Sequence, residues 1–189
     1  GYIFPDTYEF YLESDAKSVV EKFIENFNSK VTDDMKIKAK SLGYTMDQII
    51  TLASVIQKEC DADIAECANV SSVFHNRLKD PASFPRLESD VTTFYISENL
   101  KDYLGYQPDV ALENQNEDVR KYMDLYSTYY RSGLPVGAIC NPGMKAINAA
   151  LSPADTDYVF FLTDASGEHF YYASTIEEHN ANGVKAGLF

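Results

Sequence analysis

The chain has 189 residues, and at roughly 150 residues per domain this length predicts one domain rather than two. Hydrophobic residues make up 45% and charged residues 24%, a globular composition that argues against wholesale disorder, collagen-like repeats and a dedicated membrane protein. With 29 acidic and 16 basic residues the net charge is −13, so we expect neither a nucleic acid nor an anionic lipid surface as the main partner.

The N-terminal region predicts an extended segment followed by two helices. Residues 2–12 are aromatic and poor in helix formers, and Pro5-Asp6 signals a turn. Ser14 or Asp15 can cap the first helix, whose apolar residues recur at helical spacing: Val19, Val20, Phe23, Ile24 and Phe27. A second, more basic helix is expected over residues 35–42, ending at Gly43.

Two stronger helices follow and predict an antiparallel pair. Thr45 and Gln48 form a capping box for the first, which carries one buried stripe of Ile49, Leu52, Ala53, Ile56 and Cys60. Glu59 falls on the edge of this stripe rather than on the solvent face. The second helix spans residues 64–78 and buries Cys67, Ala68, Ser71, Phe74 and Leu78, and an acidic turn at 61–63 joins the two.

Helical periodicity fades between residues 79 and 134, so a long irregular segment is expected there, with the polar run 113–118 as a solvated loop. Asn141-Pro142 then predicts the cap and first residue of a short helix that ends at Pro153. Residues 158–163 and 169–172 predict a β-hairpin. Ser174 and Glu177 form a capping box for a last helix through about residue 180.

Helices first and paired strands late indicate an α+β fold rather than an alternating parallel sheet. In this fold the helix pair carrying Glu59 packs with a small antiparallel sheet. We expect residues 1–189 to form a single domain.

The cysteines and histidines predict neither a disulfide framework nor a metal site. Cys60, Cys67 and Cys140 are an odd number, so they cannot all pair with one another. On a continuous helix Cys60 and Cys67 would be separated by about 10 Å of rise, too far for a bridge, so we expect small buried side chains. The three histidines are scattered and no zinc-ligand spacing occurs, so no metal and no cofactor are predicted.

Glu59 is the candidate for acid–base chemistry. A carboxyl group held against apolar side chains loses solvation of its charged form, so its pKa rises and it can donate a proton near neutral pH. From the periodicity alone, the simpler interpretation is a helix-terminal glutamate that reaches solvent or pairs with Lys58 or Lys79.

Tyrosines are concentrated in the irregular middle, at positions 95, 103, 106, 122, 126, 129 and 130. A tyrosine ring can stack on a sugar while its hydroxyl group forms a hydrogen bond, which favours a cleft for a polar ligand. The alternative is that most of these rings simply pack the loops onto the body of the domain.

Six motifs in chain order resemble those of one family. They are Phe4-Pro5-Asp6-Thr7-Tyr8, the helix Leu52-Ala53-Ser54-Val55-Ile56-Gln57-Lys58-Glu59, Ser89-Asp90-Val91-Thr92, the segment from Tyr126 to Pro135, Asn141-Pro142-Gly143 and Glu178-His179-Asn180. Together they resemble the MltG (YceG-like) family of endolytic murein transglycosylases, and the match runs from Tyr2 to Asn180.

The resemblance implies cleavage of the MurNAc–GlcNAc β-1,4 bond of peptidoglycan without water, leaving 1,6-anhydroMurNAc ends. It assigns the reaction to Glu59, first as general acid and then as base. The matched motifs and clustered tyrosines predict a substrate-binding wall of Asp90, Thr92, Tyr95, Ser127, Thr128, Tyr129 and Asn141.

The resemblance also implies a setting in the bacterial cell envelope, at the outer face of the cytoplasmic membrane, beside the machinery of cell-wall synthesis. The membrane helix and LysM-like module usual in the family lie outside this sequence. The expected partner is the glycan strands of peptidoglycan. Binding to a nucleic acid is not expected.

Four positions depart from the family pattern: Gln57, Cys60, Val91 and Ser127. Gln57 leaves Glu59 as the single acid of its motif, whereas the shorter Ser127 puts one hydrogen bond to substrate in doubt. Two alternatives therefore stay open. One is a muramidase-type hydrolase in which Glu59 and Asp90 act as a pair, and the other is a glycan-binding module without turnover.

Overall fold

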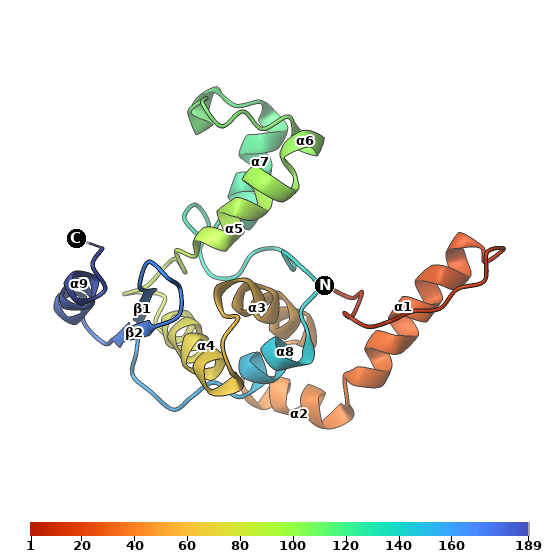
Figure 1. The fold of residues 1–189 in the computed structure, drawn as a ribbon, viewed down its shortest axis with the longest axis horizontal. Coiled ribbons are helices and arrows are strands. Elements are labelled where there is room, and N and C mark those ends of the chain that lie inside the picture. The colour runs from red at the N-terminus through yellow and green to blue at the C-terminus, as the bar shows by residue number, and fades with distance from the viewer. Residues whose placement is uncertain (189) are drawn as a thin grey trace.

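The computed structural model describes residues 1–188 and confirms the α+β class (Figure 1). The helices are α1 (Ala16–Lys30), α2 (Asp33–Ser41), α3 (Met46–Glu59), α4 (Ile64–Lys79), α5 (Asp90–Phe94), α6 (Lys101–Leu104), α7 (Glu117–Tyr126), α8 (Met144–Leu151) and α9 (Ile176–Lys185). A π-helical turn follows α5 at Tyr95–Asn99, and a 3-10 turn occupies Leu112–Asn114. Within residues 1–188, strands β1 (Phe160–Thr163) and β2 (Phe170–Ala173) form a two-stranded antiparallel sheet.

Helices α3, α4 and α8 build the main core (Figure 1), and α8 packs against both of the others. Every residue from 49 to 56 is buried, so α3 is enclosed on all sides and not only along the predicted stripe. The predicted capping box holds: Gln48 N donates to Thr45 Oγ1 at 3.2 Å and Thr45 N donates to Gln48 Oε1 at 2.9 Å. Apolar burial around α3 therefore fixes the helix that carries Glu59.

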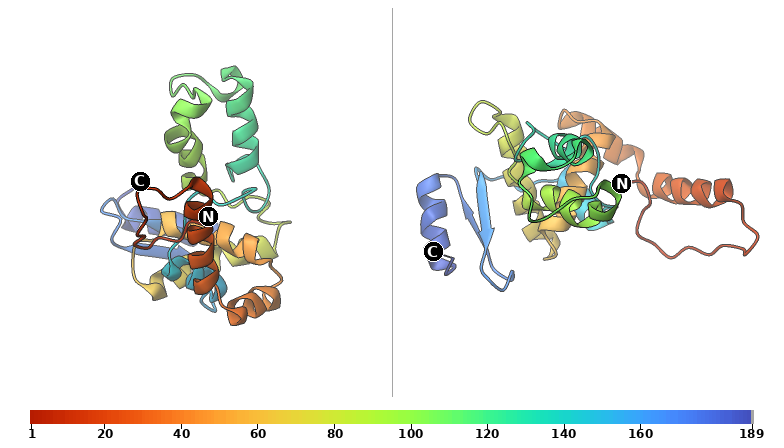
Figure 2. Two further views of the ribbon diagram at one scale, coloured as in Figure 1. Left: turned by 90° about the vertical axis from the view of Figure 1, so that its right-hand side faces the viewer. Right: turned by 90° about the horizontal axis from the view of Figure 1, so that it is seen from above.

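The middle of the chain is more regular than its sequence indicated. Residues 90–126 form an arm of short helices that projects from the body (Figures 1 and 2) and has its own small apolar cluster of Ile96, Leu104, Val119 and Met123. The polar run 113–118 is not simply a loop, because Asn116 caps α7 by accepting a hydrogen bond from Val119 N at 2.9 Å. Glu117 and Asp118 of this run occupy the first turn of α7, where they complement the helix dipole.

The N-terminal segment and α1 project from the body in a different direction from the arm (Figure 2, right). Of the five apolar residues that recur at helical spacing in α1, Phe27 is the one that is buried, and Val20 and Ile24 are exposed. Phe23 instead packs on the rings of Tyr8 and Phe10 in the extended lead-in, with centroid distances of 4.7 and 5.5 Å.

The predicted β-hairpin is present, with Phe160 opposite Ala173 and Thr163 opposite Phe170. Helix α9 packs against both strands. Its cap lies one residue later than predicted, since Thr175 accepts from Glu178 N at 3.2 Å, and the helix continues to Lys185. Helix α8 also lacks the predicted cap: Gly143 stands at the N-cap, while Asn141 accepts a hydrogen bond from Ile3 N at 3.1 Å.

The prediction that Cys60 and Cys67 cannot pair is wrong. The helix is not continuous, because α3 ends at Glu59 and the chain reverses before α4 begins at Ile64. The reversal brings the two Cα atoms to 5.5 Å, and the residues form a disulfide, while Cys140 is free. Within residues 1–188, no helix combines the length and the apolar character that crossing a bilayer requires.

Candidate active site

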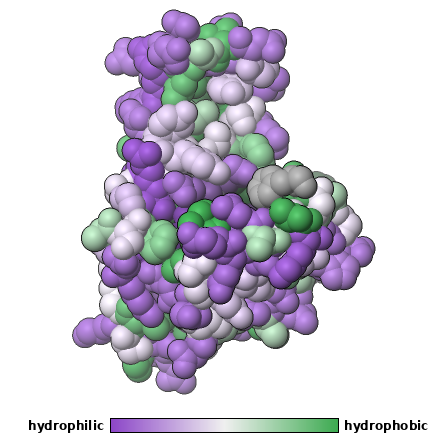
Figure 3. Space-filling model, turned by 90° about the vertical axis from the view of Figure 1, so that its left-hand side faces the viewer, coloured by the Kyte–Doolittle hydropathy of each residue, from purple (hydrophilic) through white to green (hydrophobic). Residues whose placement is uncertain are grey.

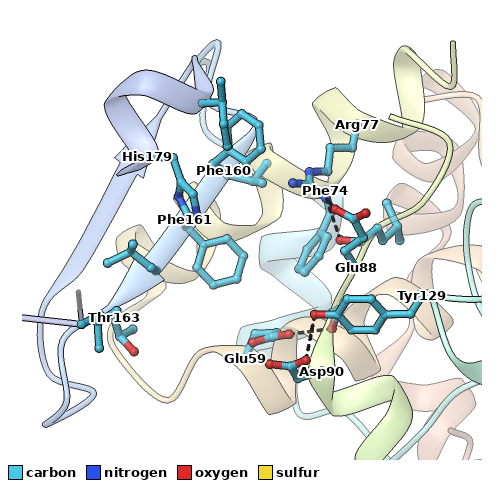
Figure 4. Close-up of a pocket in the computed structure, with 16 residues that line it drawn as sticks. Glu59, Phe74, Arg77, Glu88, Asp90, Tyr129, Phe160, Phe161, Thr163 and His179 are labelled. Atoms are coloured by element: carbon cyan, nitrogen blue, oxygen red, sulfur yellow. Dashed lines mark hydrogen bonds and ion pairs between the residues drawn. The ribbon is translucent and has the colours of Figure 1, made fainter. Parts of the chain in front are cut away.

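A cavity of about 580 Å³ lies between the main core and the β-hairpin (Figure 4). One wall comes from the end of α3, from α4 and from residues 87–90, with Tyr129 beside them. Strand β1 and helix α9 form the other wall, with Phe160, Phe161 and His179 among its residues. Seen from the α9 side, the surface is mostly hydrophilic, with small apolar patches just below the projecting arm (Figure 3).

Glu59 is the last residue of α3 and points into this cavity (Figure 4). Burial raises the pKa of its carboxyl group, and the negative charge of Asp90 raises it further. Ser89 Oγ donates a hydrogen bond to Glu59 Oε1 at 2.5 Å, which stabilises the charged form and opposes part of that rise. The cavity thus holds a carboxyl group that favours its protonated form more than a free glutamate does.

A network of buried hydroxyl groups holds Ser89 in place. Ser89 N donates to Thr128 Oγ1 at 2.9 Å, and Thr128 N donates to Thr92 Oγ1 at 2.9 Å. Thr92 Oγ1 in turn donates to Ser89 O at 2.6 Å, which closes the network. Both threonines are fully buried, so they lie behind the cavity and orient Ser89 rather than line the wall as predicted.

Asp90 and Tyr129 do line the cavity, beside Glu59 (Figure 4). Tyr129 Oη donates to Asp90 Oδ1 at 2.8 Å. Burial and the acceptor Asp90 raise the pKa of Tyr129 to about 12, so the phenol stays protonated and keeps donating. Two carboxyl groups in different settings therefore face the same space, Glu59 shielded and Asp90 exposed.

The other predicted wall residues lie elsewhere. Ser127 is fully buried, and its Oγ is 2.7 Å from Thr93 Oγ1. Tyr95 packs on Tyr126 with a centroid distance of 5.0 Å, between the arm and the main core. Asn141 bonds to the N-terminal segment and does not border the cavity. The clustered tyrosines thus mostly pack the arm, which is the alternative interpretation of that pattern.

Several lining residues were not predicted as site residues: Ser89, Arg77, Glu88, Phe160, Phe161 and His179. Ser89 and His179 stand inside motifs that matched the family, so those motifs could have indicated them. No local pattern marks the others, since the two walls meet only once the hairpin packs against α4. Near the top of the cavity, the Nδ1 atom of His179 is buried without a hydrogen-bond partner, and burial lowers the pKa of this ring.

No group of three or more metal-binding side chains occurs among residues 1–188. What the arrangement offers is a shielded proton donor, an exposed carboxylate and an aromatic wall opposite them. These groups suit acid–base chemistry on a neutral polar ligand.

Comparisons with known proteins found a matching family and several related proteins. The YceG-like family matches residues 1–185. An endolytic murein transglycosylase of Bacillus subtilis (strain 168) is 33% identical over 181 residues, which cover 95% of this chain and 46% of that protein. One from Streptococcus pneumoniae serotype 2 is 26% identical over 183 residues, covering 96% of this chain and 31% of that protein.

A crystal structure of a YceG-like protein from Listeria monocytogenes has the same fold, with a TM-score of 0.72 and 27% identity. The match covers 96% of this chain and 53% of that one. The chain spans less than half the length of the two transglycosylases.

Proposed function

Because this chain belongs to the YceG-like family, we propose that it is an endolytic murein transglycosylase acting on the glycan strands of peptidoglycan. It would cleave the β-1,4 bond between MurNAc and GlcNAc without water and leave 1,6-anhydroMurNAc ends. The single observation that carries this proposal is Glu59, whose pKa burial raises at the floor of a cavity with a second carboxylate beside it.

In the first step, protonated Glu59 would donate its proton to the glycosidic oxygen, and the bond from that oxygen to C1 of MurNAc breaks. A carboxyl group that stays protonated nearer to neutral pH is suited to this role. In lysozyme, an apolar pocket likewise raises the pKa of the glutamate that acts as general acid. The positive charge that develops at C1 would lie near Asp90, whose carboxylate can stabilise it electrostatically.

In the second step, the Glu59 carboxylate would accept the proton of the MurNAc C6 hydroxyl group, and the C6 oxygen bonds to C1. Glu59 is then protonated again, and no water is consumed. One catalytic carboxyl group suffices because the nucleophile belongs to the substrate, so no second carboxylate has to activate water or form a covalent adduct.

Binding of the sugars would draw on both walls of the cavity. Asp90 and the Tyr129 hydroxyl group can form hydrogen bonds with sugar hydroxyls, and the rings of Phe160 and Phe161 offer apolar faces opposite. We further propose that the protein works in the cell envelope, at the outer face of the cytoplasmic membrane, near cell-wall synthesis enzymes.

The test is mass spectrometry of the products released from purified sacculi in heavy-oxygen water. Wild type should release fragments with unlabelled 1,6-anhydro ends, Glu59→Gln should release almost none, and the exposed control Glu25→Gln should match wild type. Labelled reducing ends would overturn the proposal in favour of a hydrolase that uses Glu59 and Asp90. Binding to sacculi without soluble products, unchanged in Glu59→Gln, would instead identify a binding module.

A further inference from the structure

Arg77 of α4 connects the two walls of the cavity and is almost wholly buried, with 7% of its surface exposed. Toward the hairpin, its Nε donates to Val159 O at 2.7 Å. Toward the other wall, its Nη1 donates to Leu87 O at 3.0 Å and pairs with Glu88 Oε2 at 3.2 Å. A planar guanidinium group can satisfy acceptors in several directions at once, which a lysine ammonium group cannot do in the same geometry.

Two aromatic rings complete the surroundings of the Arg77 side chain. Its guanidinium carbon lies 5.4 Å from the ring centroid of Phe84 and 5.1 Å from that of Phe160. Phe84 lies in the segment that leads to Ser89, whereas Phe160 begins β1 and lines the hairpin wall. The cation is thus held by contacts with these two rings as well as by hydrogen bonds.

Glu88 has a backbone conformation that side chains rarely adopt. Its φ of 54° is the one positive value for a residue other than glycine within residues 1–188. Left-handed backbone is unfavourable for a residue with a Cβ atom and persists where surrounding contacts enforce it. The contacts here are the ion pair with Arg77 and the hydrogen bond that Glu88 N donates to Thr128 O at 3.3 Å.

The residue after Glu88 is Ser89, whose Oγ donates to Glu59. The direction of Ser89 follows from the backbone turn at Glu88, and Arg77 holds that turn through the Leu87 carbonyl and the Glu88 carboxylate. We propose that Arg77 is a positioning residue for the reaction: it fixes the Glu88 turn that aims Ser89 at Glu59.

The kinetic test of this inference rests on the proposed function, whereas a titration of Glu59 does not. Loss of the Ser89 hydrogen bond removes an interaction that lowers the pKa of Glu59, so that pKa should rise. The rise can be measured by NMR titration of the Glu59 carboxyl carbon without any substrate. If wild type made no anhydro products, the proposed function would fail while this titration still tested the role of Arg77.

The first experiment compares Arg77→Lys with the control Arg86→Lys, whose side chain is exposed and does not border the cavity. For Arg77→Lys we expect kcat on soluble glycan strands to fall by about 10- to 100-fold, since small misplacements of reacting groups cost up to about that much. KM should change little, and the basic limb of the pH profile and the titrated pKa of Glu59 should both move upward. An unchanged kcat and pKa in folded Arg77→Lys, or a raised KM with kcat intact, would overturn the proposal.

The second experiment tests the route through the backbone, with the matched pair Glu88→Ala and Glu88→Gly. Both variants remove the ion pair with Arg77, but glycine adopts a φ of 54° at little cost, whereas alanine does not. If the turn is what Arg77 maintains, Glu88→Ala should lose several-fold more kcat than Glu88→Gly. Equal losses in the two variants would contradict the proposed route.

Discussion

The main core of α3, α4 and α8 and the projecting arm of residues 90–126 contribute different parts of the candidate site. Glu59 stands at the end of α3, a helix buried on all sides, whereas Asp90 begins the arm and Tyr129 follows its last helix. The core packs a large set of buried side chains, and the arm has a separate cluster of four. Glu59 is therefore anchored in the best-packed part of the molecule. Asp90 and Tyr129 stand where the smaller arm joins the core.

This difference suggests a division of roles. A proton donor needs a fixed, desolvated setting, which dense packing supplies. Groups that contact a long polymer benefit from a lobe with a smaller core, because such a lobe can open at a lower free-energy cost.

Replacing the proton donor should have the largest effect on activity. Glu59→Gln keeps the shape of the side chain but cannot give up or take up a proton, so turnover should fall by roughly 10²- to 10⁴-fold. Asp90→Asn should cost less, because in the proposed reaction Asp90 stabilises charge and transfers no proton. Kinetics on soluble glycan strands checks both, and an equal or larger loss in Asp90→Asn would favour a paired-carboxylate hydrolase.

A matched pair of cavity mutations compares the two regions directly, since Ile147 of α8 and Ile96 of the arm are both fully buried. Ile147→Ala should lower the free energy of global unfolding by about 2–5 kcal/mol, as measured by denaturant titration. Ile96→Ala should act mainly within the arm, with hydrogen exchange rising over residues 90–126 and little change elsewhere. Uniform loss of protection in Ile96→Ala would show that the arm and core unfold as one unit.

The disulfide behind Glu59 should stabilise the core end of the site. Cys60 and Cys67 close a short loop, for which the chain-entropy estimate gives roughly 2–3 kcal/mol. The double variant Cys60→Ala, Cys67→Ala should lose about that much free energy of unfolding, and reduction of wild type should have the same effect. Cys140→Ala serves as the control because Cys140 is a free thiol and this variant keeps the disulfide, so reductant should lower its melting temperature as it does in wild type. The melting temperature of the double variant should not respond to reductant.

The smallest effect concerns pH and stability. Burial raises the pKa of Glu59 above its ordinary value of 4.5, so the folded protein binds this proton more tightly than the unfolded chain. Between 4.5 and the folded pKa, stability therefore falls as pH rises, by about 1.4 kcal/mol in total for each unit of the shift. Glu59→Gln should be more stable than wild type at pH 7, and the difference should vanish below 4.5. Parallel stability curves for the two proteins would contradict the shift.

The sequence alone determined those features that depend on neighbouring residues. Periodicity and capping chemistry indicated α3, α4 and the hairpin, because the 3.6-residue and two-residue repeats of apolar side chains are local properties. The same periodicity placed Glu59 at the edge of a buried stripe, and the motifs that matched the family pointed to that residue as well. The arm was missed because its helices are short and their buried residues are few.

Only the tertiary structure decided which side chains meet in the cavity. The chain reversal after Glu59 pairs Cys60 with Cys67, and the buried network of Thr92 and Thr128 turns Ser89 toward Glu59. Arg77 gains its role when the hairpin, more than 80 residues later in the chain, packs beside α4. Such contacts join segments far apart in sequence, and their geometry depends on the packing of the whole domain, which no local pattern of residues encodes.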